Sequence, residues 1–247
     1  MRNRISVWVS CLCFLLAAFF ALAAVSAGFG TRLGLWDFRT GFVILRLTAY
    51  GGLASAALSA FVALAGLSVQ GPKVSLALSA LGLVIGGAVF YVPASWWREA
   101  QRVPMIHDIT TDPGDPPEFV MILPLRKNAP NPPEYGGPDV AEKQRAAYPD
   151  VKPLTLPEEL DKAFEMALVA ARKMDWEIVD ANKRAGRIEA TDTTFWFGFK
   201  DDVVIRVRPV GEGRSRIDVR STSRVGMGDI GTNAKRVRNY LKAVDNG

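Results

Sequence analysis

Three aspartates are the side chains in this sequence whose type and spacing best suit catalysis. Asp192, Asp201 and Asp202 flank the aromatic run 195–199. Carboxylates can act as general acids, general bases or nucleophiles, so these three are the candidate catalytic residues of a hydrolase. Trp196 lies among them, and an aromatic ring beside carboxylates also suits a ligand-binding cleft. Both interpretations stay open at this stage.

Arginines recur at alternate positions farther along the chain. Arg206 and Arg208 share one face of a predicted strand, and Arg216 and Arg220 share the same face of the next. The apolar positions between them are expected to pack against helices; they are Val203, Ile205, Val207, Ile217 and Val219. The cationic face predicts either a solvated, salt-bridged surface or a site for an anionic lipid or an acidic protein partner.

The rest of the usual catalytic machinery is scarce. His107 is the one histidine, and it lies in a proline-rich stretch, while Cys11 and Cys13 both fall inside the first apolar segment. A serine or cysteine triad therefore lacks its parts, and a lone histidine without a rigid scaffold is a poor metal ligand. We expect no metal and no cofactor, and a non-enzymatic protein more than an enzyme.

A glycine pattern near the C-terminus resembles a phosphate-binding loop. Residues 226–231 read Gly-Met-Gly-Asp-Ile-Gly, which fits Gly-x-Gly-x-x-Gly. A dinucleotide-binding fold would need a further strand after the following helix, and the chain ends first. The glycines are therefore expected to turn a strand into a helix, with Asp229 as the helix cap.

Three apolar segments precede these residues, over about 5–27, 47–69 and 74–92, and they predict a transmembrane anchor within residues 1–97. Each is long enough to cross a hydrocarbon core of about 30 Å at about 1.5 Å per residue. The tight turn at 70–73 makes the second and third an antiparallel hairpin. Gly52, Ala56 and Ala60 in the second segment, and Gly82 and Gly86 in the third, allow close helix packing.

Charge supports a membrane location and argues against nucleic acid. Residues 1–97 hold six basic side chains and one acid, whereas residues 98–247 hold 24 of each. The excess cations thus lie at the ends of apolar segments, where they contact lipid headgroups. We expect a multi-pass protein of the bacterial inner (plasma) membrane that contacts the lipid bilayer and no nucleic acid.

The side of the membrane follows from the first segment. Arg2 and Arg4 precede it, and Val25-Ser26-Ala27 also suits a signal-peptide cleavage site. The apolar run is long for a signal peptide, which favours a retained helix. With an internal N-terminus, either alternative exports the C-terminal domain to the periplasm.

The region after the anchor divides at residue 154. Residues 98–154 form a proline-rich connecting segment, since twelve of the fifteen prolines lie between Pro104 and Pro157. Within it, 119–123 suits an edge strand and 140–148 a short helix. Residues 155–247 predict an α+β two-layer domain. One helix is expected to start at a capping box at Thr155–Glu158 and to end at about Met174, and a second over about 230–244. Both should lie on one face of a four-stranded antiparallel sheet built from 176–181, 187–197, 203–210 and 214–223.

The motifs of this region resemble a known family. The run WEIVDANKRAGRIEATDTTFWFGFKDDVVIRVRP, the run SRIDVRSTSRVGMGDIGTNAKRVRNYL and the upstream motifs IHDITTD and PPEF, with Tyr135, are similar to the bacterial and plastid family catalogued as domain of unknown function 1499. The resemblance implies a membrane-associated or envelope protein and an ordered connecting segment. It supplies no catalytic residues.

The sequence as a whole predicts a membrane-anchored envelope protein. Its small domain is expected to bind an anionic lipid or a membrane-protein partner, or to serve a structural role. The alternative is a carboxylate-dependent hydrolase that acts at the membrane.

Overall fold

The computed structural model describes residues 2–68 and 70–246. The chain divides into two compact units. One unit comprises Met1–Glu99 with the short segment Phe195–Gly198, and the other comprises Ala100–Thr194 with Phe199–Gly247.

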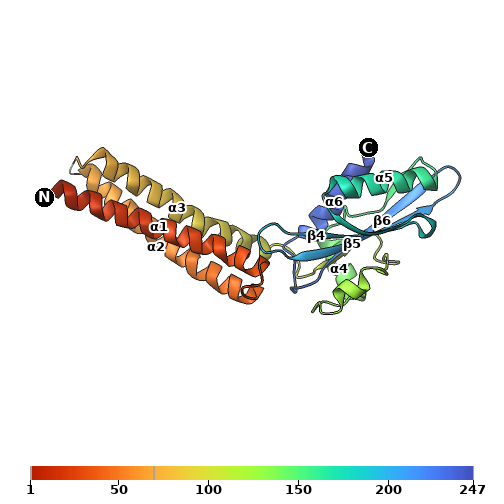
Figure 1. The fold of residues 1–247 in the computed structure, drawn as a ribbon. Helices are drawn as coiled ribbons and strands as arrows, with labels where there is room; N and C mark the ends of the chain where they lie inside the picture. The colour runs from red at the N-terminus through yellow and green to blue at the C-terminus, as the bar shows by residue number, and fades with distance from the viewer. Residues whose placement is uncertain (1, 69, 247) are drawn as a thin grey trace. The chain divides into compact units, whose positions relative to one another are not determined.

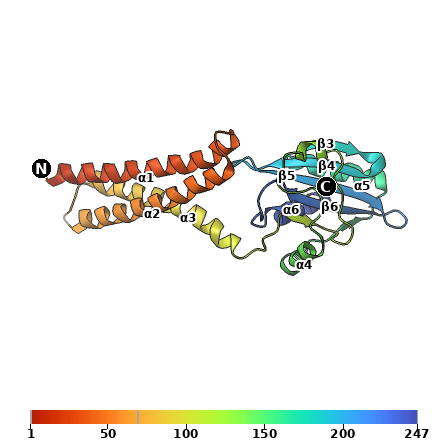
Figure 2. The same ribbon diagram turned by 90° about the horizontal axis from the view of Figure 1, so that it is seen from below.

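The first unit is built on three helices, α1 (Arg2–Arg32), α2 (Phe38–Ser68) and α3 (Lys73–Ala100), which lie side by side (Figures 1 and 2). Each is long and apolar enough to cross a membrane. Large apolar side chains such as Leu12, Phe19 and Leu22 are exposed on the outer surface of this unit. Apolar surface of this extent is costly in water and suits a lipid environment.

Glycines bring α2 and α3 into close contact. A Cβ atom added to Gly86 would lie 2.6 Å from the carbonyl oxygen of Gly52, and one added to Gly52 would lie 2.9 Å from that of Gly86. The close approach predicted from these small residues is therefore confirmed. Hydroxyl groups join α1 to α3, since Ser10 Oγ lies 2.6 Å from Ser75 Oγ and Ser79 Oγ donates to Ser10 at 3.0 Å.

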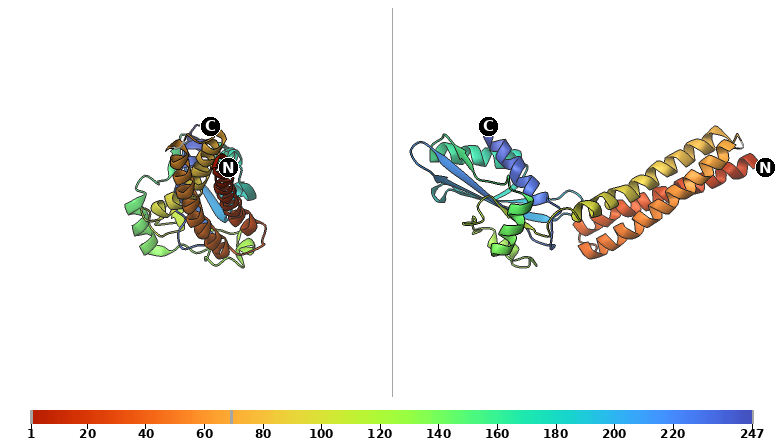
Figure 3. Two further views of the ribbon diagram at one scale, coloured as in Figure 1. Left: turned by 90° about the vertical axis from the view of Figure 1, so that its left-hand side faces the viewer. Right: turned by 180° about the vertical axis from the view of Figure 1, so that it is seen from behind.

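The second unit contains an antiparallel sheet (Figure 3). Its strands are β1 (Asp108–Thr110), β2 (Leu154–Leu156), β3 (Glu177–Asn182), β4 (Arg187–Thr193), β5 (Lys200–Pro209) and β6 (Ser215–Ser223). The order is β1-β6-β5-β4-β3, and β2 also pairs with β6. The strands β3 to β6 correspond to the four predicted strands. The predicted extension of the second strand to residue 197 is wrong, because β4 ends at Thr193 and Phe195–Gly198 belongs to the first unit.

The predicted sheet of four strands is wrong in number, because the sheet has six. The two additional strands, β1 and β2, are three residues long each. Alternation cannot be recognised over three residues, and both strands border a proline-rich sequence that reads as irregular. They add to β6 on the side away from β5 and so complete its backbone hydrogen bonds.

Helices α5 (Leu160–Lys173) and α6 (Thr232–Asp245) cover one face of the sheet (Figure 1). The main core lies between these two layers and includes Phe164, Ile205, Ile217 and Tyr240. The Tyr240 hydroxyl donates to the carbonyl of Ala167 at 2.9 Å, which joins α6 to α5. The alternate apolar residues of β5 and β6 belong to this core, as predicted.

Local predictions at the start of α5 were wrong. Thr155 does not cap the helix, because it lies in β2 opposite Arg216 and the N-cap position is Glu159. The short helix predicted at 140–148 is confirmed as α4 (Gly137–Ala147). The glycine-rich turn leads into α6 as predicted, but the N-cap position is Gly231 and not Asp229. Asp229 instead lies before the cap and accepts hydrogen bonds from the amides of Gly231 and Asn233 at 2.9 and 2.7 Å.

The connecting segment covers the second face of the sheet. Phe119 and Ile122 pack on Val204 of β5 and form a small separate core. The predicted edge strand at 119–123 is wrong: the amides of Val120, Met121 and Ile122 donate to the buried carboxylate of Glu189 at 2.9–3.1 Å and do not join a strand. A short 3₁₀ helix, η1 (Leu123–Arg126), follows. The domain therefore has three layers, with helices, sheet and connecting segment in turn.

Candidate functional site

The three candidate catalytic aspartates lie on two different faces of the sheet. Asp192 and Asp201 occupy the helix-covered face, where both carboxylates accept from the guanidinium of Arg236 in α6, at 2.8 and 2.6 Å. Asp202 points to the opposite face because side chains alternate along a strand. The structure therefore separates the three carboxylates instead of bringing them together.

Asp202 is fully buried in a second arginine cluster. Its carboxylate accepts from Arg126 at 2.7 Å and from Arg224 at 2.8 and 2.9 Å, and the Thr191 hydroxyl donates to it at 2.7 Å. These charge-assisted hydrogen bonds hold the connecting segment to the sheet, and they occupy both oxygens of the carboxylate.

The predicted ligand-binding arginines also pair with aspartates. Arg206, Arg208 and Arg216 cluster on the face covered by the connecting segment and contact Asp112, Asp115 and Asp218 at 2.6–3.8 Å. Hydrogen bonding from Arg208, with the nearby positive charge of Arg206, lowers the pKa of the Asp115 carboxyl. Three cations and three anions make this cluster electrically neutral. Arg220 does not belong to it.

Trp196 lies in the other compact unit. There its indole Nε1 donates to the carbonyl of Val25 at 2.9 Å, and its ring lies 5.5 Å from that of Trp96 between centroids. The Phe195 side chain of the same segment is exposed, whereas Phe197 is buried. Asp192, Asp201 and Asp202 belong to the second compact unit.

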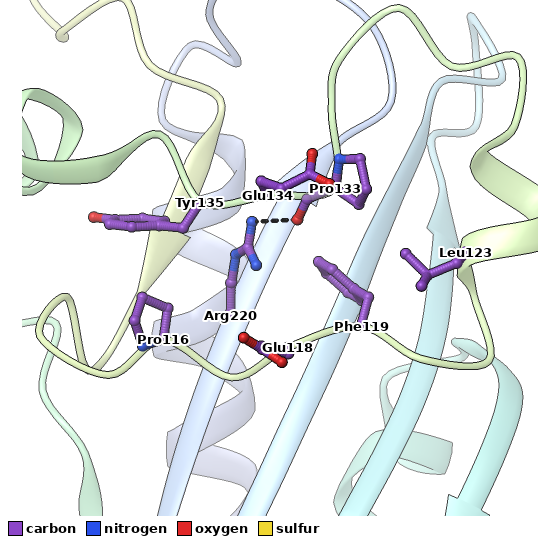
Figure 4. A pocket seen from close by; sticks show the side chains of 8 residues that line it. All are labelled: Pro116, Glu118, Phe119, Leu123, Pro133, Glu134, Tyr135 and Arg220. Carbon is purple, nitrogen blue, oxygen red and sulfur yellow. Dashed lines mark hydrogen bonds between the residues drawn. The ribbon is translucent and has the colours of Figure 1, made fainter.

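A pocket in the domain surrounds Arg220 instead (Figure 4). Its volume is about 310 Å³, close to the lower end of the range of small-molecule sites. The connecting segment supplies most of the lining and β6 supplies Arg220. The lining residues are Pro116, Glu118, Phe119, Leu123, Pro133, Glu134, Tyr135 and Arg220.

Arg220 is fixed before any ligand arrives. It is 2% exposed, and its Nε and Nη2 atoms donate to the two carboxylate oxygens of Asp108 at 2.9 and 2.6 Å. Nη2 also donates to the carbonyl of Pro133 at 2.8 Å. The guanidinium carbon lies 5.0 Å from the ring centroid of Phe119 and 5.5 Å from that of Tyr135. Figure 4 shows the guanidinium between these two rings.

The acidic side chains of the pocket outnumber its cation. Glu118 and Glu134 are exposed at the rim, and the charge of Arg220 is matched by Asp108. Burial, together with the nearby Asp108 carboxylate, raises the pKa of Tyr135 to about 12, while the positive charges of Arg220 and Arg145 oppose the shift. Tyr135 is therefore a neutral phenol at physiological pH, and its buried hydroxyl has no hydrogen-bond partner in the described part of the chain.

Comparison with protein families agrees with this architecture. Residues 108–244 match the family described as "Protein of unknown function (DUF1499)". The chain belongs to the DUF1499 family. The match begins at the first residue of β1 and ends within α6, so residues 108–154 of the connecting segment are part of the DUF1499 domain. A search of curated proteins finds no match to this chain.

The sequence predicted only part of the pocket of the DUF1499 domain. Arg220 was predicted as a ligand-binding residue, but Phe119, Tyr135 and Asp108 were not. The motifs PPEF and IHDITTD and the residue Tyr135 carried the resemblance to the family, and they supply the pocket walls and the partner of Arg220. Membership of these residues in the family motifs was therefore the signal in the sequence that could have found the pocket. No periodicity predicts that they lie around β6.

Proposed function

We propose that this protein is a membrane-anchored, non-enzymatic binding protein whose DUF1499 domain holds a ligand in the Arg220 pocket. The observation that supports this function best is the preorganised guanidinium. Arg220 is buried, held by both oxygens of Asp108 and enclosed by two aromatic rings, yet it lines a pocket of about 310 Å³. A polar group fixed in advance costs little conformational entropy when a ligand binds.

Binding is supported over hydrolysis by the arrangement of the carboxylates. A hydrolase needs acidic side chains that converge on one concave site. Asp192 and Asp201 share Arg236, Asp202 lies on the other face with Arg126, and none of the three lines the Arg220 pocket. Each is more readily explained as part of an ion pair that stabilises the domain.

The membrane supplies the partner that we propose. The three helices anchor the chain in a bilayer, which we propose to be the bacterial plasma membrane, with the DUF1499 domain on its outer side. Seven residues, Gln101–His107, connect α3 to β1 and span at most about 25 Å when extended. Lipids are therefore always present at high effective concentration near the domain. A membrane-protein partner remains the alternative occupant.

Pocket occupancy can be tested with two substitutions in η1. Leu123 lines the pocket and Leu125 does not, although both side chains are about half exposed. Leu123→Trp should fill the pocket and Leu125→Trp should leave it open. Native mass spectrometry of the detergent-solubilised full chain, after equilibration with a total polar lipid extract, measures retained lipid. Loss of retained lipid in Leu123→Trp but not in Leu125→Trp supports the proposal. Equal amounts of retained lipid in the two variants contradict it.

Orientation is tested by fusing reporters to the C-terminus. Alkaline phosphatase is active only outside the plasma membrane, and a cytosolic fluorescent protein folds only inside. Phosphatase activity is expected. Fluorescence without phosphatase activity would place the DUF1499 domain in the cytoplasm and contradict the proposed orientation.

A further inference from the structure

Resting on the function proposed above, we propose that the Arg220 pocket recognises a zwitterion in which an oxyanion is joined by a short linker to an ammonium group. The phosphoethanolamine headgroup of a membrane lipid has this chemistry. The inference deepens the proposed function by assigning the class of ligand, and it depends on the unused hydrogen-bonding capacity of Arg220 and on the charge of the pocket rim.

The oxyanion half follows from the donors of Arg220. A guanidinium carries five N–H groups. Two donate to Asp108 and one to Pro133 at 2.6–2.9 Å, and Nη1 makes a long contact of 3.4 Å to the carbonyl of Pro117. The fifth N–H, also on Nη1, has no acceptor among residues 2–68 and 70–246. A ligand oxygen placed against Nη1 would satisfy this donor and replace the weak contact.

The ammonium half follows from the charge around that donor. Asp108 already neutralises Arg220, and the pocket adds the carboxylates of Glu118 and Glu134. A simple anion would therefore meet a surrounding of net negative charge, and like charges disfavour its binding. A ligand that also carries an ammonium group would place a positive charge near the glutamates. The rings of Phe119 and Tyr135 add apolar walls to the pocket.

Size and surroundings agree with a lipid headgroup. The pocket volume of about 310 Å³ lies at the lower end of the range of small-molecule sites, which suits a headgroup and not a whole lipid. Apolar side chains continue beyond the pocket residue Leu123, where Val120, Met121 and Leu125 are exposed. Glycerol and acyl carbons attached to a bound headgroup would contact this surface.

The test titrates the detergent-solubilised full chain with four soluble probes by isothermal calorimetry. These are dihexanoyl phosphatidylethanolamine, the corresponding phosphatidylglycerol, the corresponding phosphatidylcholine and free phosphoethanolamine. Phosphatidylethanolamine should bind at least about tenfold more tightly than phosphatidylglycerol, because a charge-assisted hydrogen bond is involved. Phosphatidylcholine, whose cation cannot donate hydrogen bonds, should bind more weakly than phosphatidylethanolamine.

Three substitutions assign the binding to the pocket. Glu118→Gln and Glu134→Gln should each weaken phosphatidylethanolamine binding by about threefold to tenfold and leave phosphatidylglycerol unchanged. Glu142→Gln is the matched control, since Glu142 is exposed on α4 and does not line the pocket. These glutamates are at the surface, so the variants are expected to fold as the wild type does.

The outcomes separate the ligand class from the proposed function. Equal affinity for phosphatidylglycerol and phosphatidylethanolamine would overturn the proposal that the ligand is a zwitterion. If free phosphoethanolamine binds about as tightly as dihexanoyl phosphatidylethanolamine, the zwitterionic ligand class is supported and the ligand is a soluble molecule instead of a lipid. If none of the four probes binds, yet Leu123→Trp still removes retained lipid, the ligand class is wrong and the proposed function stands. If Leu123→Trp also changes nothing, both fail.

Discussion

The carboxylate of Asp202 lies 2.7 Å from Nη1 of Arg126, although the two residues are separated by 76 positions in the chain. Both side chains are buried. Arg126 also donates to the carbonyl oxygens of Asn131 and Pro132. One ion pair thus attaches two parts of the connecting segment to the centre of the sheet.

Removing Arg126 should therefore destabilise the domain strongly. Arg126→Ala leaves the Asp202 charge buried with fewer partners, which typically costs about 3–5 kcal/mol. Lys127→Ala is the control, because Lys127 is exposed and its removal is expected to change stability by less than about 0.5 kcal/mol. Pulse proteolysis of the solubilised full chain in increasing urea measures both. Equal urea midpoints for the two variants would show that the pair contributes nothing.

A second prediction concerns Glu189 and the segment that it holds. The Glu189 carboxylate is fully buried and accepts three backbone amides, those of Val120, Met121 and Ile122. Glu189→Gln replaces one acceptor oxygen by a donor, which would face amide donors. We expect hydrogen–deuterium exchange of these three amides to accelerate by about tenfold or more, since at least one hydrogen bond to a charged acceptor is lost.

The control for Glu189 is Glu177→Gln, because Glu177 is exposed on the edge strand β3. Exchange at 120–122 should be unchanged in that variant. If Glu189→Gln also leaves exchange at these amides unaltered, packing of Phe119 and Ile122 on Val204 holds the segment without the carboxylate.

The sequence predicted those parts of the fold that have a period. The apolar spans, helices α5 and α6 and strands β3 to β6 all show repeated apolar positions, because each buries one continuous face. The three-residue strands β1 and β2, and the layer formed by the connecting segment, have no period to detect. They are held by single long-range contacts such as Arg126–Asp202 and Arg220–Asp108, which local spacing cannot reveal.

The dependence on periodic patterns also explains which features of the candidate site the sequence predicted. Alternation placed Arg206, Arg208, Arg216 and Arg220 on one face of the sheet, in agreement with the strand register. It gave no information about which acidic residue each would meet. Asp112, Asp115 and Asp218 neutralise the first three, while Asp108 fixes Arg220 in a pocket whose walls come from the connecting segment. The partners, and hence the function of each arginine, depend on tertiary structure.

A third prediction compares two adjacent glycines in α3. A Cβ atom at Gly86 would lie 2.6 Å from the backbone oxygen of Gly52, whereas one at Gly87 has no neighbour within 4 Å. Gly86→Ala should separate α2 from α3 and cost about 1–3 kcal/mol through overpacking. Gly87→Ala should be neutral or slightly stabilising. Thermal unfolding of the full chain in detergent measures the difference, and a Gly86→Ala variant as stable as Gly87→Ala would show that the helices can shift without cost.

The last prediction is the pH dependence that arises from Tyr135. Its pKa is raised to about 12 in the folded domain, chiefly by burial, while an unfolded tyrosine titrates near 10. Between these two values the folded state binds more protons than the unfolded state. Stability should therefore fall as pH rises from about 10 to about 12, and this contribution is absent in Tyr135→Phe.

Absorbance at 295 nm, which reports tyrosinate, measures the titration of Tyr135 as the difference between the wild type and Tyr135→Phe. A midpoint near 12 is expected, together with a melting temperature that declines more steeply above pH 10 in the wild type than in the variant. A midpoint near 10 would mean that the phenol is solvated, and the pocket wall next to Arg220 would then be open to water.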